Sequence, residues 1–75
     1  MEKEGAKMPL EKLNLSARPY NALMRNGINT VEELLQMDSE EIMSIPYLGV
    51  NGREEIRSAL KRAGYKKRQL PDIFW

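Results

Sequence analysis

Apolar residues recur at helical spacing in four segments of the 75-residue chain, and each segment has its own start or stop signal. In the first segment, Leu23 and Met24 share one face, and Ser16 before it is a suitable N-cap. In the second, Thr30 and Glu33 form a capping box of the T-x-x-E type. No segment has the sustained alternation of a strand. The predicted helices cover residues 17–26, 31–36, 40–44 and 52–63.

Two of these helices follow segments that resemble each other. The octets that begin at Gly27 and Gly49 share Gly, Asn and a Glu-Glu pair at the same positions. Each octet describes a glycine turn followed by a new helix. Ser39 is expected to cap the third helix, and Ala63 to be buried in the last one. The sequence therefore predicts an all-α fold, a compact bundle of four short helices with two helix-hairpin-helix-like units.

The chain divides into three parts by pattern. Residues 1–8 are polar and unpatterned and are interpreted as a flexible N-terminal arm. Residues 9–65 form the helical domain, and residues 66–75 form a basic and then apolar C-terminal tail. We expect Ile73, Phe74 or Trp75 of this tail to fold back onto the core.

The composition excludes several kinds of catalytic and metal-binding site. The chain contains neither cysteine nor histidine, so it cannot build a disulfide, a thiolate metal site or a Ser-His-Asp triad. Its three Glu-Glu pairs lie in the first turns of predicted helices, where carboxylates cap amides. We therefore expect no enzymatic activity, no cofactor and no metal. The longest apolar runs are short, which predicts no membrane association and a cytoplasmic location.

The net charge of +1 hides an uneven distribution along the chain. Residues 1–51 carry five basic and eight acidic side chains, whereas residues 52–68 carry seven basic and two acidic ones. Within the latter, Arg53, Arg57 and Lys61 are spaced to form one stripe on a helix. Such a stripe is either an ordinary solvated face or a phosphate-facing surface. This basic third of the chain is the part that would attract an anionic partner.

Two features point more specifically to nucleic acid. The glycine-rich hairpin over residues 45–52 precedes a helix, and glycines and free helix amides can grip a phosphate without side chains. The same hairpin could equally be a simple connection closed by Leu48 and Val50. Arg18, at the start of the first helix, is either an ordinary surface charge or an arginine that inserts into a narrow A·T-rich minor groove.

The order of motifs resembles a known family. Residues 13–23 are similar to the pattern Leu-x-Leu-Ser-x-Arg-x-x-Asn-x-Leu that opens the C-terminal domain of the bacterial RNA polymerase alpha subunit. Residues 27–35 resemble that family's second helix, and residues 48–56 match part of its segment Asn-Leu-Gly-Lys-Lys-Ser-x-x-Glu-Ile. The resemblance covers residues 9–65.

The resemblance implies a helical domain that binds A·T-rich DNA upstream of promoters and docks transcription activators, in association with RNA polymerase. It implies that Arg18 enters the minor groove with Asn21 beside it. The other half of the implied surface consists of Gly49, Asn51, Gly52 and Glu55.

Four departures from the family pattern predict altered DNA binding. Where the family usually has Lys and Ser, this protein has Asn51 and Gly52, so a phosphate-binding charge and a hydroxyl are missing. Tyr47 stands where Asn is common in the family, and Val50 replaces a basic residue. We expect DNA binding to be weaker than in the family, or displaced toward Arg53 and the basic tail. A second hypothesis is a protein–protein interaction domain of the same fold with weak or lost DNA binding. A third is a helix-hairpin-helix that grips phosphates without sequence preference.

Overall fold

The computed structural model describes residues 8–75, and within them the chain is helical, as predicted. Residues 1–7, which include most of the expected N-terminal arm, lie outside the described residues. Four α-helices follow one another, and short 3-10 turns, labelled η, lie before the first of them and after the last. The elements are η1 (Leu10–Leu13), α2 (Ala17–Arg25), α3 (Val31–Leu35), α4 (Ser39–Met43), α5 (Gly49–Arg62), η2 (Lys67–Gln69) and η3 (Asp72–Phe74).

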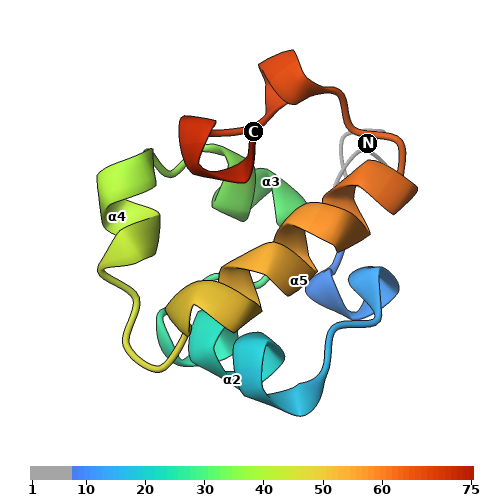
Figure 1. Cartoon of the computed structure of the whole chain (residues 1–75). Coiled ribbons are helices and arrows are strands. Elements are labelled where there is room, and N and C mark those ends of the chain that lie inside the picture. The colour runs from blue at the N-terminus through green and yellow to red at the C-terminus, as the bar shows by residue number, and fades with distance from the viewer. Residues whose placement is uncertain (1–7) are drawn as a thin grey trace.

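Helix α5 crosses the middle of the molecule, and the other elements surround it (Figure 1). It contacts α2, η1 and η3, and η3 also contacts α4. The first turns of α5 lie next to α2, and the C-terminal tail covers the opposite side of the bundle (Figure 1). Helix α5 is therefore the element that packs against both α2 and the C-terminal tail.

The core is made of aliphatic side chains from every helix together with two side chains of the tail. Leu23, Ile56, Leu60 and Phe74 have no exposed surface, and Leu70 is 5% exposed. The expectation that the apolar tail folds back is thus confirmed for Phe74. A hydrogen bond from the Ile73 amide to Ser39 Oγ, 3.0 Å long, also fastens the tail to α4. The buried side chains of this hydrophobic core are Leu10, Leu13, Ala22, Leu23, Ile28, Val31, Leu34, Ile42, Ile45, Leu48, Ile56, Ala59, Leu60, Leu70 and Phe74.

The expected cap of the third helix is wrong by one residue. Asp38, and not Ser39, is the N-cap of α4, and its Oδ1 accepts from the Glu41 amide over 3.0 Å. Glu41 Oε1 accepts in return from the Asp38 amide over 3.0 Å. Ser39 is free to hold the tail because the carboxylate one residue earlier already completes the capping box.

Helix α5 begins at Gly49, three residues earlier than predicted. The sequence pattern places Gly49 in the connection before the helix, and Gly49 does have a left-handed backbone, with φ of +68°. Gly52 is an ordinary helical residue inside the first turn. Two residues that were expected on buried apolar faces are exposed instead. Met24 is 38% exposed, and Ala63 is exposed as well. Ala63 lies beyond the last turn of α5, where the core has already ended.

Candidate nucleic-acid interface

The four helices differ in how their N-termini are satisfied. The first turns of α3 and α4 are closed by capping boxes, in which Glu33 and Glu41 bond back to the caps Thr30 and Asp38. Helices α2 and α5 have no side-chain cap and no acid in their first turn. Their first amides lack intrahelical partners and carry the positive end of the helix dipole. These two N-termini are therefore the ones suited to an anionic ligand.

The two open N-termini lie side by side, with the buried Gly52 between them. Gly52 is buried, and a Cβ at this position would lie 3.0 Å from Leu48 Cδ1 and 3.6 Å from Pro19 Cβ. Pro19 belongs to the first turn of α2, where a missing N–H costs no intrahelical bond. A serine here, as in the family pattern, would require the end of the Leu48 side chain to shift by a few tenths of an ångström. Glycine therefore fits this tightly packed position without that shift.

Glu55 ties the two helices together from the other side. Its Oε2 accepts from the Ser16 amide over 2.5 Å, and its Oε1 accepts from Ser16 Oγ over 2.7 Å. Ser16 is the N-cap of α2 by position, as predicted, but its hydroxyl donates to Glu55 instead of capping the helix. These two bonds hold the pKa of the Glu55 carboxyl below its ordinary value. Glu55 therefore braces the start of α2 as an ion.

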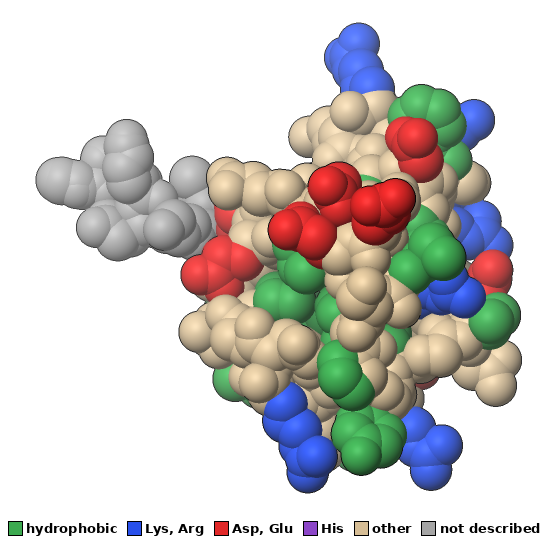
Figure 2. Space-filling view, turned by 90° about the vertical axis from the view of Figure 1, so that its left-hand side faces the viewer, with side chains coloured by type: hydrophobic (Ala, Val, Ile, Leu, Met, Phe, Trp, Pro, Cys, Tyr) green, Lys and Arg blue, Asp and Glu red, His purple; other side chains and the backbone are tan. Residues whose placement is uncertain are grey.

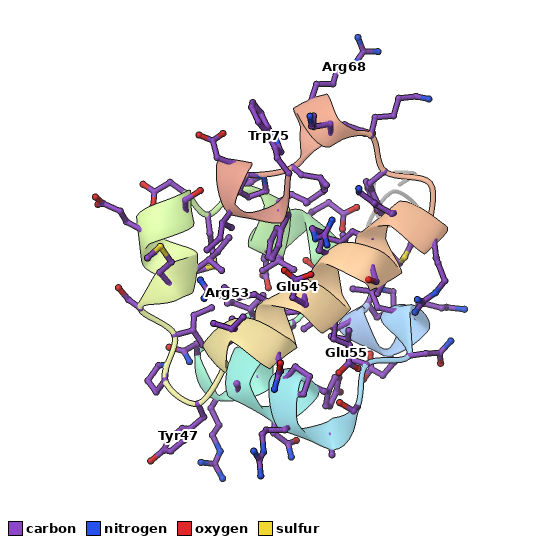
Figure 3. The ribbon with its side chains drawn as sticks, in the orientation of Figure 1. Tyr47, Arg53, Glu54, Glu55, Arg68 and Trp75 are labelled. Atoms are coloured by element: carbon purple, nitrogen blue, oxygen red, sulfur yellow. The ribbon has the colours of Figure 1, made fainter. Side chains whose placement is uncertain are left out.

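The turn that precedes α5 has two left-handed residues around a buried one. Tyr47 has φ of +67° and Gly49 of +68°, and Leu48 between them is only 4% exposed. This alternation turns Leu48 into the core and leaves Tyr47 77% exposed (Figure 3). A left-handed tyrosine is unfavourable by about 1 kcal/mol or more, so packing of Leu48 holds the turn.

Two hollows meet at the open helix ends, and both are lined by Arg18 and Tyr47. The first, of about 460 Å³, lies along α2 and also includes Asn21 and Arg25. The second, of about 500 Å³, lies between the starts of α2 and α5. Its remaining lining residues are Ser16, Pro19, Leu48, Gly49, Val50, Asn51, Gly52 and Glu55. We call the surface made by both hollows the α2–α5 surface.

Six of the seven residues predicted for the site lie on this surface. Arg18, Asn21, Gly49 and Asn51 are exposed, Gly52 is buried, and Glu55 is half-buried. The seventh, Arg53, is half-buried, and its Nε donates to the Gly49 carbonyl over 3.4 Å.

Sequence reasoning missed Arg25 as a member of the surface, and it identified Tyr47 only as a departure from the family pattern. Helical spacing from Arg18 and Asn21 could have indicated Arg25. The exposure of Tyr47 depends on a backbone angle that the sequence pattern does not show.

Charge is distributed unevenly over the molecule. Acidic side chains gather on the face formed by α4, and Lys and Arg side chains lie around the upper, right-hand and lower edges of that view (Figure 2). The basic stripe that the spacing predicts along α5 is partly neutralised, because Arg57 Nη2 pairs with Glu54 Oε1 at 2.7 Å. The cations that line the α2–α5 surface are Arg18 and Arg25.

Comparison with known proteins shows the family of this chain. Residues 1–62 match the model of a family described as the C-terminal domain of the bacterial RNA polymerase alpha subunit. The protein belongs to this family. It is 51% identical over 57 residues to the DNA-directed RNA polymerase subunit alpha of Desulforudis audaxviator, which is 76% of this sequence and 18% of that protein. The subunit of Desulforamulus reducens is 45% identical over 83% of the sequence, and that of Desulfitobacterium hafniense 45% over 87%.

The chain spans about a fifth of the length of these alpha subunits. Within residues 8–75, no helix is long and apolar enough to cross a membrane. The same described residues contain no cluster of three or more acidic, histidine or cysteine side chains that could hold a metal ion.

The brace between Glu55 and Ser16 predicts a pH dependence of stability for this alpha C-terminal domain. The pKa of Glu55 is lowered in the folded protein by the Ser16 amide and hydroxyl, so its contribution is present above the ordinary value of 4.5. That contribution is lost as the pH falls from 4.5 through the lowered folded pKa. We expect the free energy of unfolding of wild type to exceed that of Glu55→Gln at pH 7, and the difference to shrink below pH 4.5.

Urea unfolding of both proteins across this pH range measures the difference. Comparing the two cancels the contributions of Glu11 and Glu54, whose pKa values are also lowered, by Tyr20 and Arg57 respectively. A difference that stays constant from pH 7 to pH 3 would contradict an ionised brace.

Proposed function

We propose that this protein binds A·T-rich duplex DNA through the α2–α5 surface, as a transcription module. The observation that carries the proposal is that two uncapped helix N-termini and the exposed Arg18, in the first turn of α2, line one hollow. In the proposed complex, Arg18 enters the minor groove, where a narrow A·T-rich tract has an enhanced negative potential. Asn21, one turn further along α2, lies beside it in the same hollow.

The two helix ends supply the phosphate contacts in this proposal. Gly49 and Asn51, at the start of α5, line the hollow between the helices, and we expect their free amides to contact phosphate there. Arg25 extends the positive charge along α2. Gly52 and Glu55 act by holding the helices together, and Tyr47 forms a wall that both hollows share. The site thus depends on backbone positioning more than on many cations.

The proposed affinity is modest because Asn51 takes a position where the family usually has lysine. Each phosphate contact that is absent lowers the slope of log K against log salt by about 0.9. With Arg18 and Arg25 as the lining cations, we expect a shallow salt dependence and weak binding at physiological salt.

We further propose that the acidic face of α4 docks a basic surface of a transcription activator or polymerase subunit. A hollow between α4 and the tail, which we call the α4 hollow, is lined by Asp38, Glu40 and Asp72 together with Met37. Acidic and apolar groups in one hollow suit a partner with complementary charge. In this role the domain acts in the cytoplasm by binding, without catalysis of its own.

A titration of backbone amide signals tests the proposal for DNA. We expect an A·T-rich duplex to shift the signals of Arg18, Asn21 and Gly49, and a G·C-rich duplex of equal length to shift them less. Equal affinity for the two duplexes would favour phosphate gripping without sequence preference. If neither duplex shifts any of these signals, the DNA proposal is wrong and the protein-interaction hypothesis remains.

A further inference from the structure

The C-terminal tail forms a second basic surface, away from the α2–α5 surface. Lys66, Lys67 and Arg68 line an open hollow together with Trp75, which we call the tail hollow. Arg68 and Trp75 lie at the end of the molecule opposite Tyr47 (Figure 3). The family model ends at residue 62, so the family match does not account for the tail hollow.

Trp75 is fixed in this hollow although half of it is exposed. Its indole Nε1 donates to the Leu70 carbonyl over 2.9 Å, and its amide donates to the Asp72 carbonyl over 2.9 Å. Leu70 and Phe74, on the same segment, are anchored in the core. The Trp75 side chain nevertheless remains 53% exposed. A ring that is already ordered loses little conformational freedom when a ligand stacks on it.

The tail hollow is also positively charged, because no acidic side chain lines it. Its three charged side chains are all basic, and Lys67 Nζ lies 5.6 Å from the centroid of the Trp75 ring. Asp72 is the one acidic residue in residues 56–75, and it lines the α4 hollow instead. The tail hollow therefore combines an exposed aromatic ring with cations, and it suits an anionic ligand that carries planar groups.

We propose that the tail hollow binds single-stranded nucleic acid, with a base stacked on Trp75 and phosphates at Lys66, Lys67 and Arg68. A basic surface with an aromatic platform is the combination that single strands require. Duplex DNA fits less well because its base faces are hidden in the stack. An acidic peptide would satisfy the cations but would make no use of a fixed indole ring. This inference is independent of the proposed duplex binding, since it uses a different surface.

Intrinsic fluorescence tests the inference directly, because Trp75 is the only tryptophan of the sequence. We expect an oligothymidylate of about 12 nucleotides to quench this fluorescence, and a poly-glutamate peptide of similar charge to leave it unchanged. In anisotropy titrations with labelled oligothymidylate, Trp75→Ala should weaken binding by about five-fold or more. Arg68→Ala should lower the salt slope by about 0.7.

Two control variants separate this inference from the proposed function. Arg18→Ala should leave oligothymidylate binding unchanged, as should Lys12→Ala, which removes an exposed charge outside both surfaces. Loss of oligothymidylate binding in Arg18→Ala would overturn the tail hollow as the site. If poly-glutamate quenches the Trp75 fluorescence as strongly as oligothymidylate does, the proposal of a single strand is overturned. The ligand would then be an acidic protein partner. If Trp75→Ala fails to fold, Arg68→Ala decides, and an unchanged salt slope overturns the proposal.

Discussion

Replacement of Arg18 by alanine is expected to weaken binding to an A·T-rich duplex by about 5- to 150-fold, which corresponds to the loss of about 1–3 kcal/mol. Arg18 is exposed and lines both hollows of the α2–α5 surface, so no other side chain replaces it between the helix ends. The variant should also lose most of its preference for A·T-rich over G·C-rich duplex. Anisotropy titrations with both duplexes at several salt concentrations measure both effects.

Arg25→Ala is the matched control, since it removes the same charge from the outer end of one hollow. We expect it to lower the salt slope by about 0.9 while keeping the A·T preference. Circular dichroism should show both variants folded, because Arg18 and Arg25 are exposed. If Arg18→Ala binds the A·T-rich duplex as tightly as wild type does, Arg18 does not enter the minor groove. The protein-interaction hypothesis would then be the better account of the surface.

Replacement of Phe74 by alanine is expected to cost about 3–5 kcal/mol of stability, because it empties a fully buried position. A protein of this length has only about 4–11 kcal/mol in total. The midpoint of thermal unfolding should fall by at least about 12 °C. The reason is that Phe74 closes the core against α5 and α4 through η3, although it lies beyond the residues that the family model matches. Thermal unfolding followed by circular dichroism measures the change.

Two controls accompany this prediction. Phe74→Leu should cost clearly less than Phe74→Ala, because leucine leaves a smaller cavity. Met43→Ala, at a side chain that is 63% exposed, should change stability by no more than about 0.5 kcal/mol. If Phe74→Ala unfolds at the same temperature as wild type, the tail is not part of the core. In that case the fixed position of Trp75 would lose its support as well.

The candidate site was only partly predictable from the sequence. Arg18 and Asn21 follow from the motif that carries the family resemblance, and both lie on the α2–α5 surface. The role of Glu55 was not predictable, because its partner Ser16 is 39 positions away in the sequence. Gly52 was interpreted as a lost hydroxyl, whereas its position between Leu48 and Pro19 makes it a packing residue. Tyr47 owes its exposure to a left-handed backbone that Leu48 imposes from the core.

Local chemistry settles the helical class, the Thr30–Glu33 capping box and the uneven charge of the sequence, because each depends on neighbours within one or two turns. The absence of cysteine and histidine likewise excludes thiol and imidazole chemistry without reference to any fold. Packing decides which helix N-termini face each other and which stay uncapped. It also decides that the tail anchors Trp75 beside Lys67. These features arise from contacts between segments far apart in sequence, whose energies exist only once the core has formed.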